Sequence, residues 1–118
     1  MLTLSGGLKI FLRREPTDMR LGYEGLSTLA RNVFGQSPTS GHLFVFVNRS
    51  KNRSKMLLWE GGGFWLCSRR LEQGTFVMPA LSETRQNTWE IDRLEWMSFL
   101  EGIVIHQMSR KKRYIPLA

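Results

Sequence analysis

The chain has 118 residues, which is enough for one domain with one modest hydrophobic core. Hydrophobic residues make up 42% of it and aromatic residues 11%, and this composition excludes a disordered tail. A single cysteine, Cys67, excludes an internal disulfide and a cysteine-based zinc cluster, and it fits a reducing compartment. The N-terminal apolar runs fit neither a secretory signal nor a membrane span. We therefore expect a cytoplasmic protein without a membrane partner.

The formal net charge of +7 is unevenly distributed along the chain. Residues 1–59 hold nine Lys and Arg against three acidic residues, whereas residues 60–118 hold eight against seven. Four of those eight form the run Arg110 to Arg113 near the C-terminus. Basic chains also bind acidic proteins or membranes, but charge concentrated in this way favours a phosphate-binding face, so we rank DNA first among the partners.

The first third of the sequence predicts a strand followed by a helix. Alternation of apolar residues predicts a strand over Leu8 to Arg13. Helical spacing then runs up to Gly35, where we expect the helix to stop because glycine accepts a left-handed conformation. Thr17 or Asp18 is the expected N-terminal cap of this helix.

The middle of the chain predicts a three-stranded antiparallel meander. Its strands are expected at His42 to Val47, Met56 to Trp59 and Phe64 to Leu71, all rich in β-branched and aromatic residues. The basic tip Asn48 to Lys55 separates the first two strands. The glycines of Glu60 to Gly63 allow a tight reversal before the third, and no Lys-Ser/Thr pair follows them that would indicate a phosphate loop.

The last third predicts a short strand over Thr75 to Met78, a polar loop over Ala80 to Thr88, and a second helix that contains Ile91 and stops near Gly102. The fold class is therefore α+β, a small single domain with an antiparallel β-sheet meander of about four to five strands packed with two helices. We assign residues 1–108 to this domain and residues 109–118 to a basic C-terminal tail.

Basic residues around the predicted hairpin form the candidate DNA-binding surface. The tip presents cations on a loop between two strands, and nearby arginines extend that surface. The tail is expected to add an arm that reaches phosphates, and the alternative of a merely solvated tail stays open. A polar, basic hairpin tip also serves simply to prevent sheet-to-sheet aggregation, and this alternative stays open. The candidate DNA-binding residues are Arg13, Arg14, Arg20, Arg49, Lys51, Arg53, Lys55, Arg69, Lys111 and Lys112.

Catalysis has little support in the sequence. His42 lies at the entrance to a strand, Asp18 and Glu60 lie in expected turns, and Cys67 lies in an apolar strand, so each has a structural role as its simpler explanation. His106 is the only other histidine of the chain. We predict no catalytic residues, no metal site and no cofactor.

Short motifs follow one another in a fixed order over residues 8–104. They are Thr17-Asp18-Met19-Arg20 with Gly22, Gly25 and Leu26; Ser40-Gly41-His42-Leu43-Phe44-Val45-Phe46; Lys55 with Leu57-Leu58-Trp59-Glu60-Gly61, Gly63 and Phe64; Arg70-Leu71-Glu72 with Gly74 and Phe76; and Leu100-Glu101-Gly102-Ile103. In these motifs the chain resembles the second open reading frame product, often called TnpB, of bacterial insertion sequences of the sixty-six (IS66) type. That family usually has Trp where this chain has Leu58 and Asp where it has Glu60.

The resemblance implies a non-catalytic accessory role in transposition, alongside a separate transposase that carries the strand-transfer chemistry. Together with the charge pattern, it leads us to expect a protein that binds DNA phosphates through the basic hairpin and assists the transposase. The alternative is an assembly factor that contacts the transposase or another accessory protein without binding DNA directly. In that case Trp59, Trp65 or Trp89 would serve as interface anchors.

Overall fold

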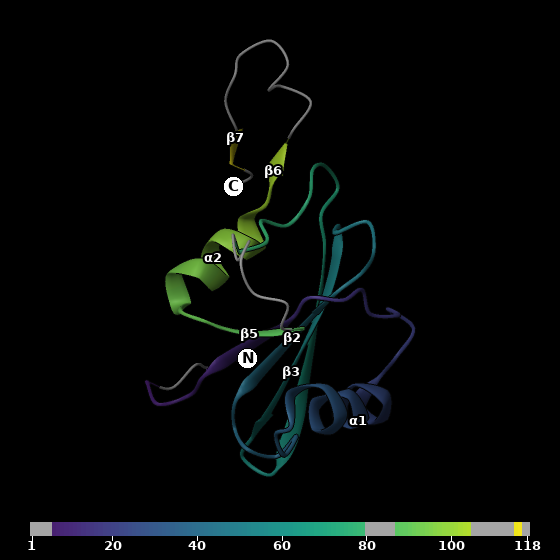
Figure 1. Cartoon of the computed structure of the whole chain (residues 1–118), viewed down its shortest axis with the longest axis vertical. Helices are drawn as coiled ribbons and strands as arrows, with labels where there is room; N and C mark the ends of the chain where they lie inside the picture. The colour runs from purple at the N-terminus through teal and green to yellow at the C-terminus, as the bar shows by residue number, and fades with distance from the viewer. Residues whose placement is uncertain (1–5, 80–86, 105–114, 117–118) are drawn as a thin grey trace.

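The computed structural model describes residues 6–79, 87–104 and 115–116. It has the predicted α+β fold, with a five-stranded mixed sheet and a helix against each of its faces (Figure 1). The order of the strands in the sheet is β4-β3-β2-β1-β5. The elements are β1 (Ile10–Arg13), α1 (Tyr23–Phe34), β2 (Leu43–Val47), β3 (Arg53–Glu60), β4 (Gly63–Arg70), β5 (Thr88–Ile91), α2 (Arg93–Glu101) and the paired short strands β6 (Ile103–Val104) and β7 (Ile115–Pro116).

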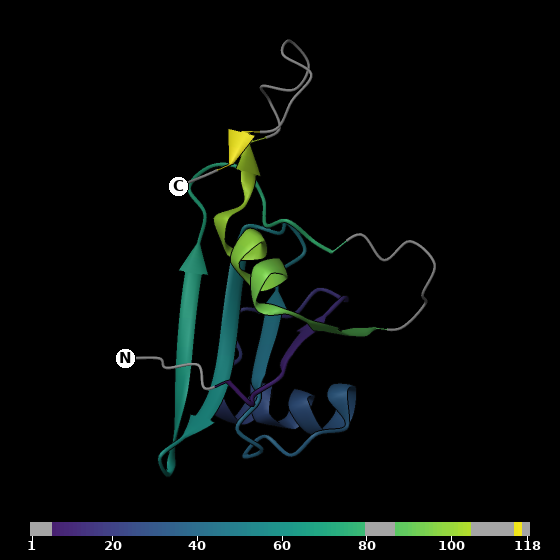
Figure 2. The ribbon, with the colours of Figure 1, turned by 90° about the vertical axis from the view of Figure 1, so that its left-hand side faces the viewer.

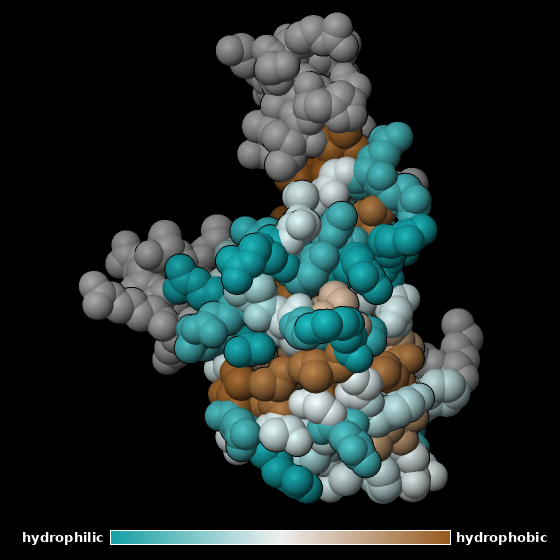
Figure 3. Space-filling view, turned by 90° about the vertical axis from the view of Figure 1, so that its right-hand side faces the viewer, coloured by the Kyte–Doolittle hydropathy of each residue, from teal (hydrophilic) through white to brown (hydrophobic). Residues whose placement is uncertain are grey.

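Strand β2 is buried on both faces, which explains its uninterrupted apolar sequence. Val45 packs in one cluster with Phe99 of α2, whereas Phe44 packs in a second cluster with Leu26 and Ala30 of α1. Hydrophilic residues cover most of the surface seen in Figure 3, where they flank a band of hydrophobic residues. In the part of the chain that the structure describes, no helix combines the length and apolar character needed to cross a bilayer.

The predicted meander is confirmed for β2, β3 and β4, which pair antiparallel. Gly61 and Gly62 connect β3 to β4 with φ angles of 60° and 84°. Positive φ at both central residues is the signature of a two-residue type I′ turn, and such a turn fixes the register of the strands on either side.

Strands β1 and β5 extend the sheet beyond the meander. Strand β1 pairs parallel with β2 and antiparallel with β5. The parallel pairing arises because α1 carries the chain back to the end of the sheet where β1 began. The sequence interpretation missed β5, since its four residues follow a polar stretch and offer only Trp89 and Ile91 as an alternating pair.

The start of α1 differs from the prediction, whereas its end agrees. Gly22 is the N-terminal cap residue, so the prediction of Thr17 or Asp18 is wrong. Both candidates have other partners: Thr17 accepts a hydrogen bond from the Arg13 guanidinium, and Asp18 binds Arg20. At the other end Gly35 has a φ of 65° and caps the helix as predicted.

The segment before α2 is not the strand that the sequence predicted over Thr75 to Met78. Thr75 forms an isolated bridge with Ile103, and Phe76 stacks on Phe99 of α2 with ring centroids 4.6 Å apart. Most of the predicted loop over Ala80 to Thr88 lies outside the described residues, and its last residue belongs to β5.

Helix α2 begins with a capping box and ends at Gly102, the predicted stop. The Glu95 N–H donates to the Asp92 carboxylate at 2.8 Å, and the Asp92 N–H donates to the Glu95 carboxylate at 2.9 Å. These reciprocal bonds satisfy backbone donors that the first turn of a helix leaves free.

Candidate anion-binding site

The basic tip between β2 and β3 is shorter than the sequence suggested. The Asn48 side chain closes the turn by accepting hydrogen bonds from the backbone N–H groups of Asn52 and Arg53, both at 3.0 Å. Strand β3 starts at Arg53, so Arg53 and Lys55 belong to a rigid strand rather than to the loop. Only Arg49 and Lys51 of the four predicted tip cations lie in the turn, and both are exposed.

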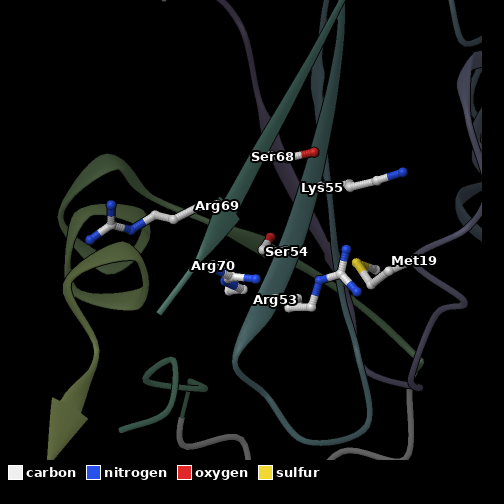
Figure 4. Close-up of a pocket in the computed structure, with 7 residues that line it drawn as sticks. All are labelled: Met19, Arg53, Ser54, Lys55, Ser68, Arg69 and Arg70. Carbon is white, nitrogen blue, oxygen red and sulfur yellow. The ribbon is translucent and has the colours of Figure 1, made fainter. Parts of the chain in front are cut away.

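Strands β3 and β4 form a cationic pocket beside the turn, with a volume of about 230 Å³ (Figure 4). Alternation along the paired strands places Arg53 and Lys55 on the same sheet face as Ser68 and Arg70. None of the residues that line the pocket is acidic. They are Met19, Arg53, Ser54, Lys55, Ser68, Arg69 and Arg70.

Arg53 and Arg70 are direct cross-strand partners. Because the Arg53 carbonyl accepts from Asn48 and the Asn52 carbonyl accepts from Leu71, the two arginines form a pair without mutual backbone hydrogen bonds. Side chains approach most closely at such pairs, and like charges directly opposite each other are destabilising. Arg70 Nε also donates to the exposed Glu72 carboxylate at 2.9 Å, which offsets part of this repulsion. An anion held between the two arginines would offset more of it.

Two hydrogen bonds shape the wall of the pocket. The Lys55 ammonium donates to the Leu21 carbonyl at 2.8 Å, which holds the loop before α1 against β3. The buried Ser54 hydroxyl donates to the Phe46 carbonyl at 2.7 Å. Ser54 therefore has a structural role, whereas the exposed Ser68 hydroxyl is available to a ligand together with the cations.

Arg69, which the sequence interpretation included, points to the other face of the sheet. In Figure 4 its side chain points away from those of Arg53 and Lys55. Its Nε donates to the Leu100 carbonyl near the end of α2 at 2.9 Å. Arg70, which the sequence interpretation omitted, is the residue that faces Arg53. The sequence contained a signal for it, because a two-residue turn at Gly61-Gly62 fixes the register that pairs Arg53 with Arg70.

The predicted N-terminal arginines do not gather in the pocket. Arg13 is largely buried, with 16% of its side chain exposed, and binds Thr17 and Glu15. Arg14 lies over the Trp89 ring, 5.8 Å from its centroid. Both arginines thus have contacts within the fold. The predicted tail residues Lys111 and Lys112 lie outside the described residues.

Arg20 has 91% of its side chain exposed, and it lies in the loop that carries Met19 of the pocket. Its guanidinium binds the Asp18 carboxylate through Nε and through a second nitrogen at 2.8 Å. These hydrogen bonds, the backbone N–H of Arg20 and the nearby Lys55 charge lower the pKa of Asp18 from 3.8 to about 2. Asp18 therefore stays ionised beside the pocket.

Acid is expected to break the Asp18–Arg20 pair only at low pH. Because the folded-state pKa of Asp18 lies below its unfolded value, its stabilising effect is fully present above pH 3.8 and is lost as the pH falls through about 2. An NMR titration of the Asp18 carboxyl carbon should show a midpoint near pH 2 in the native protein, and near the ordinary aspartate value in Arg20→Gln. A midpoint that does not move in the variant would contradict the pairing.

The groups weighed for catalysis that the structure describes have structural roles, whereas His106 lies outside the described residues. His42 Nδ1 accepts from the Lys9 backbone N–H at 2.9 Å, and Glu60 accepts from the Trp65 indole at 3.0 Å. Cys67 is half-buried against the core. Among residues 6–79, 87–104 and 115–116, no group of three His, Cys, Asp or Glu side chains could hold a metal ion.

The fold and this site define a small α+β protein with a cationic pocket on a β-hairpin. The family model described as "IS66 Orf2 like protein" matches residues 8–110, so the chain belongs to this family of accessory proteins of insertion-sequence transposition, as its motifs suggested. Two relatives from Sinorhizobium fredii are similar over most of their length. "Uncharacterized protein y4jC" is 32% identical over 70% of this chain and 71% of its own, and "Uncharacterized protein y4hO" is 34% identical over 68% and 70%. No solved structure matches.

Proposed function

We propose that this accessory protein binds the phosphate backbone of DNA through the cationic pocket and thereby assists the transposase of its insertion sequence. The observation that carries the proposal is the cross-strand pair of Arg53 and Arg70, with Lys55 beside it, in a pocket without an acidic lining residue. Guanidinium groups bind phosphate oxygens through paired hydrogen bonds. A phosphate between the two arginines would offset the repulsion that remains after the Glu72 carboxylate binds Arg70.

The proposed contact is independent of base sequence. The cations project from a sheet face beside a loop, and α1 and α2 carry exposed acidic residues, Glu24 and Glu101, that disfavour either helix as a major-groove reader. Phosphate contacts set affinity and position but do not select a sequence. The protein would thus hold DNA for the transposase, with the choice of element ends made elsewhere.

A salt titration of the unmodified protein tests this proposal. If three pocket cations each neutralise one phosphate, a plot of log K against log salt for a short duplex should have a slope of roughly −3, since each contact contributes about −0.9. Fluorescence anisotropy with a labelled duplex at several salt concentrations measures the slope. A slope near zero, or no binding at low salt, would overturn the proposal.

The second candidate is a direct contact with the transposase, and exposed aromatic side chains at the β3–β4 hairpin favour it. Trp65 is 38% exposed and Tyr23 is 50% exposed, and Tyr23 lies against Phe64, whose ring packs on Trp59. Trp89 does not fit this role because it is 7% exposed. Capture of the transposase that survives high salt and is lost in Trp65→Ser would support this candidate, because phosphate contacts weaken with salt.

A further inference from the structure

Strand β4 has a free edge that runs its whole length. It is the last strand of the sheet, and within the described part of the chain no strand pairs with its outer side (Figure 2). Leu71 donates inward to Asn52, so alternation turns Cys67 and the other odd-numbered residues of β4 toward β3. The backbone N–H and C=O groups that point outward belong to Phe64, Leu66, Ser68 and Arg70.

This edge has few of the features that keep sheet edges from pairing. It is eight residues long and contains no proline and no acidic residue. Its charge is confined to one end, at Arg69 and Arg70. A parallel neighbour of the same sequence would set these arginines side by side, whereas an antiparallel neighbour sets them against the uncharged end of the other strand.

We propose that β4 pairs antiparallel with β4 of a second copy of this chain, around a two-fold axis at Cys67. In this register Trp65 faces Arg69 of the second copy on one side of the sheet, and Phe64 faces Arg70 of the second copy on the other. Both are cross-strand pairs of an aromatic ring with a cation, which attract each other. The edge is thus self-complementary, as a two-fold interface requires.

Neighbouring registers fit less well. With an axis at Ser68, Arg69 of each copy faces Cys67 of the other copy, two positions along the strand from the other Arg69. The two like charges are then close neighbours and repel. An axis at Leu66 separates the arginines but sets Phe64 opposite Ser68 and Arg70 opposite the Gly62 turn, so the aromatic partners are lost. If the two-fold axis lay between two residues, each residue whose backbone groups point outward would face a residue whose backbone groups point toward β3. The two strands could then not form regular hydrogen-bonded pairs.

The pairing joins the two sheets and brings both cationic pockets to the same face. Arg70 of one copy lies opposite Phe64 of the other, so the two Arg70 positions are six residues, or roughly 20 Å, apart along the strand direction. The inference does not depend on DNA binding. Its tests measure mass and cross-linking without DNA, so the two proposals can fail separately.

Mass measurement tests the dimer itself. Sedimentation velocity should show a species of twice the chain mass that dissociates on dilution. Ser68→Pro removes an outward-facing N–H but no N–H that bonds to β3. The variant should therefore remain folded by circular dichroism and sediment as a monomer. Arg93→Ala, an exposed change on α2, should stay dimeric. A monomer at all concentrations, or a folded Ser68→Pro dimer, would overturn the proposal.

Cysteine cross-linking tests the register. Residues without mutual backbone hydrogen bonds have Cα atoms about 4.5 Å apart, which a disulfide can span, so diamide should link Cys67 to Cys67 of the second copy. In the Cys67→Ser background, a mixture of Trp65→Cys and Arg69→Cys chains should cross-link at least tenfold faster than either variant alone. Equal rates for the mixture and the single variants would show a different register and overturn the axis at Cys67.

Discussion

Replacing Arg53 and Arg70 together with glutamine is expected to weaken duplex DNA binding by about tenfold or more at low salt. Each lost phosphate contact should also make the slope of log K against log salt shallower by about 0.9, so the pair should remove nearly two units. Glutamine keeps a polar, hydrogen-bonding side chain on the strand but removes the charge and the guanidinium fork that would bind a phosphate. Anisotropy measurements at several salt concentrations give the affinity and the slope from one data set.

A matched control separates the pocket from net charge. Arg31→Gln with Arg93→Gln makes the same change in charge at exposed positions on α1 and α2. If this control weakens binding as much as the pocket variant does, affinity follows overall charge and the pocket has no special role. The pocket variant should also melt at about the same temperature as the parent protein, because it removes both the like-charge pair and the weak, exposed Arg70–Glu72 ion pair.

Truncating Phe99 is expected to have the largest effect on stability. Phe99 is completely buried on α2 and stacks on Phe76 with an angle of 9° between the rings. Phe99→Ala should lower the free energy of unfolding by about 3–5 kcal/mol, through lost burial and the cavity that remains. Urea denaturation followed by tryptophan fluorescence measures this change.

The control for Phe99 lies on the same helix. Leu94 is 75% exposed, so Leu94→Ala should change the free energy of unfolding by less than about 0.5 kcal/mol. If the two variants were equally destabilised, the loss would reflect the helix propensity of α2 rather than the packing of Phe99 against the segment that carries Phe76.

Local signals in the sequence predicted those parts of the fold whose contacts are local. The meander followed from apolar runs around the Gly61-Gly62 turn, and the helix ends followed from Gly35 and Gly102. The cap of α1 was predicted wrongly because Asp18 has two possible partners, the orphan N–H groups of the helix and the guanidinium of Arg20. In the structure the Arg20 guanidinium, two residues away, forms the bidentate bond with the Asp18 carboxylate. The sequence pattern does not show which of the two partners Asp18 binds.

The candidate site was predicted only in part, because charge alone does not say which face of the sheet a residue occupies. Arg53 and Lys55 lie in the pocket, but as strand residues, and Arg69 lies on the opposite face. The pairing of Arg70 with Arg53 could have been predicted from the register that the Gly61-Gly62 turn sets, but Arg70 was not among the predicted residues. The burial of Arg13 was not predicted, because the sequence pattern does not show that Thr17 and Glu15, in the turn after β1, contact its guanidinium.

The central place of β1 has a consequence for how the chain folds. Strand β1 lies between β2 and β5, and its partners in β5 are 75 residues (Arg13 with Thr88) to 81 residues (Ile10 with Ile91) away in sequence. The hairpin of β3 and β4 can form early from neighbouring residues, but closing such a long loop delays the last pairing. On the ribosome, one edge of β1 therefore stays unpaired until β5 has emerged. Chaperone binding or mispairing at this edge is most favoured during that interval.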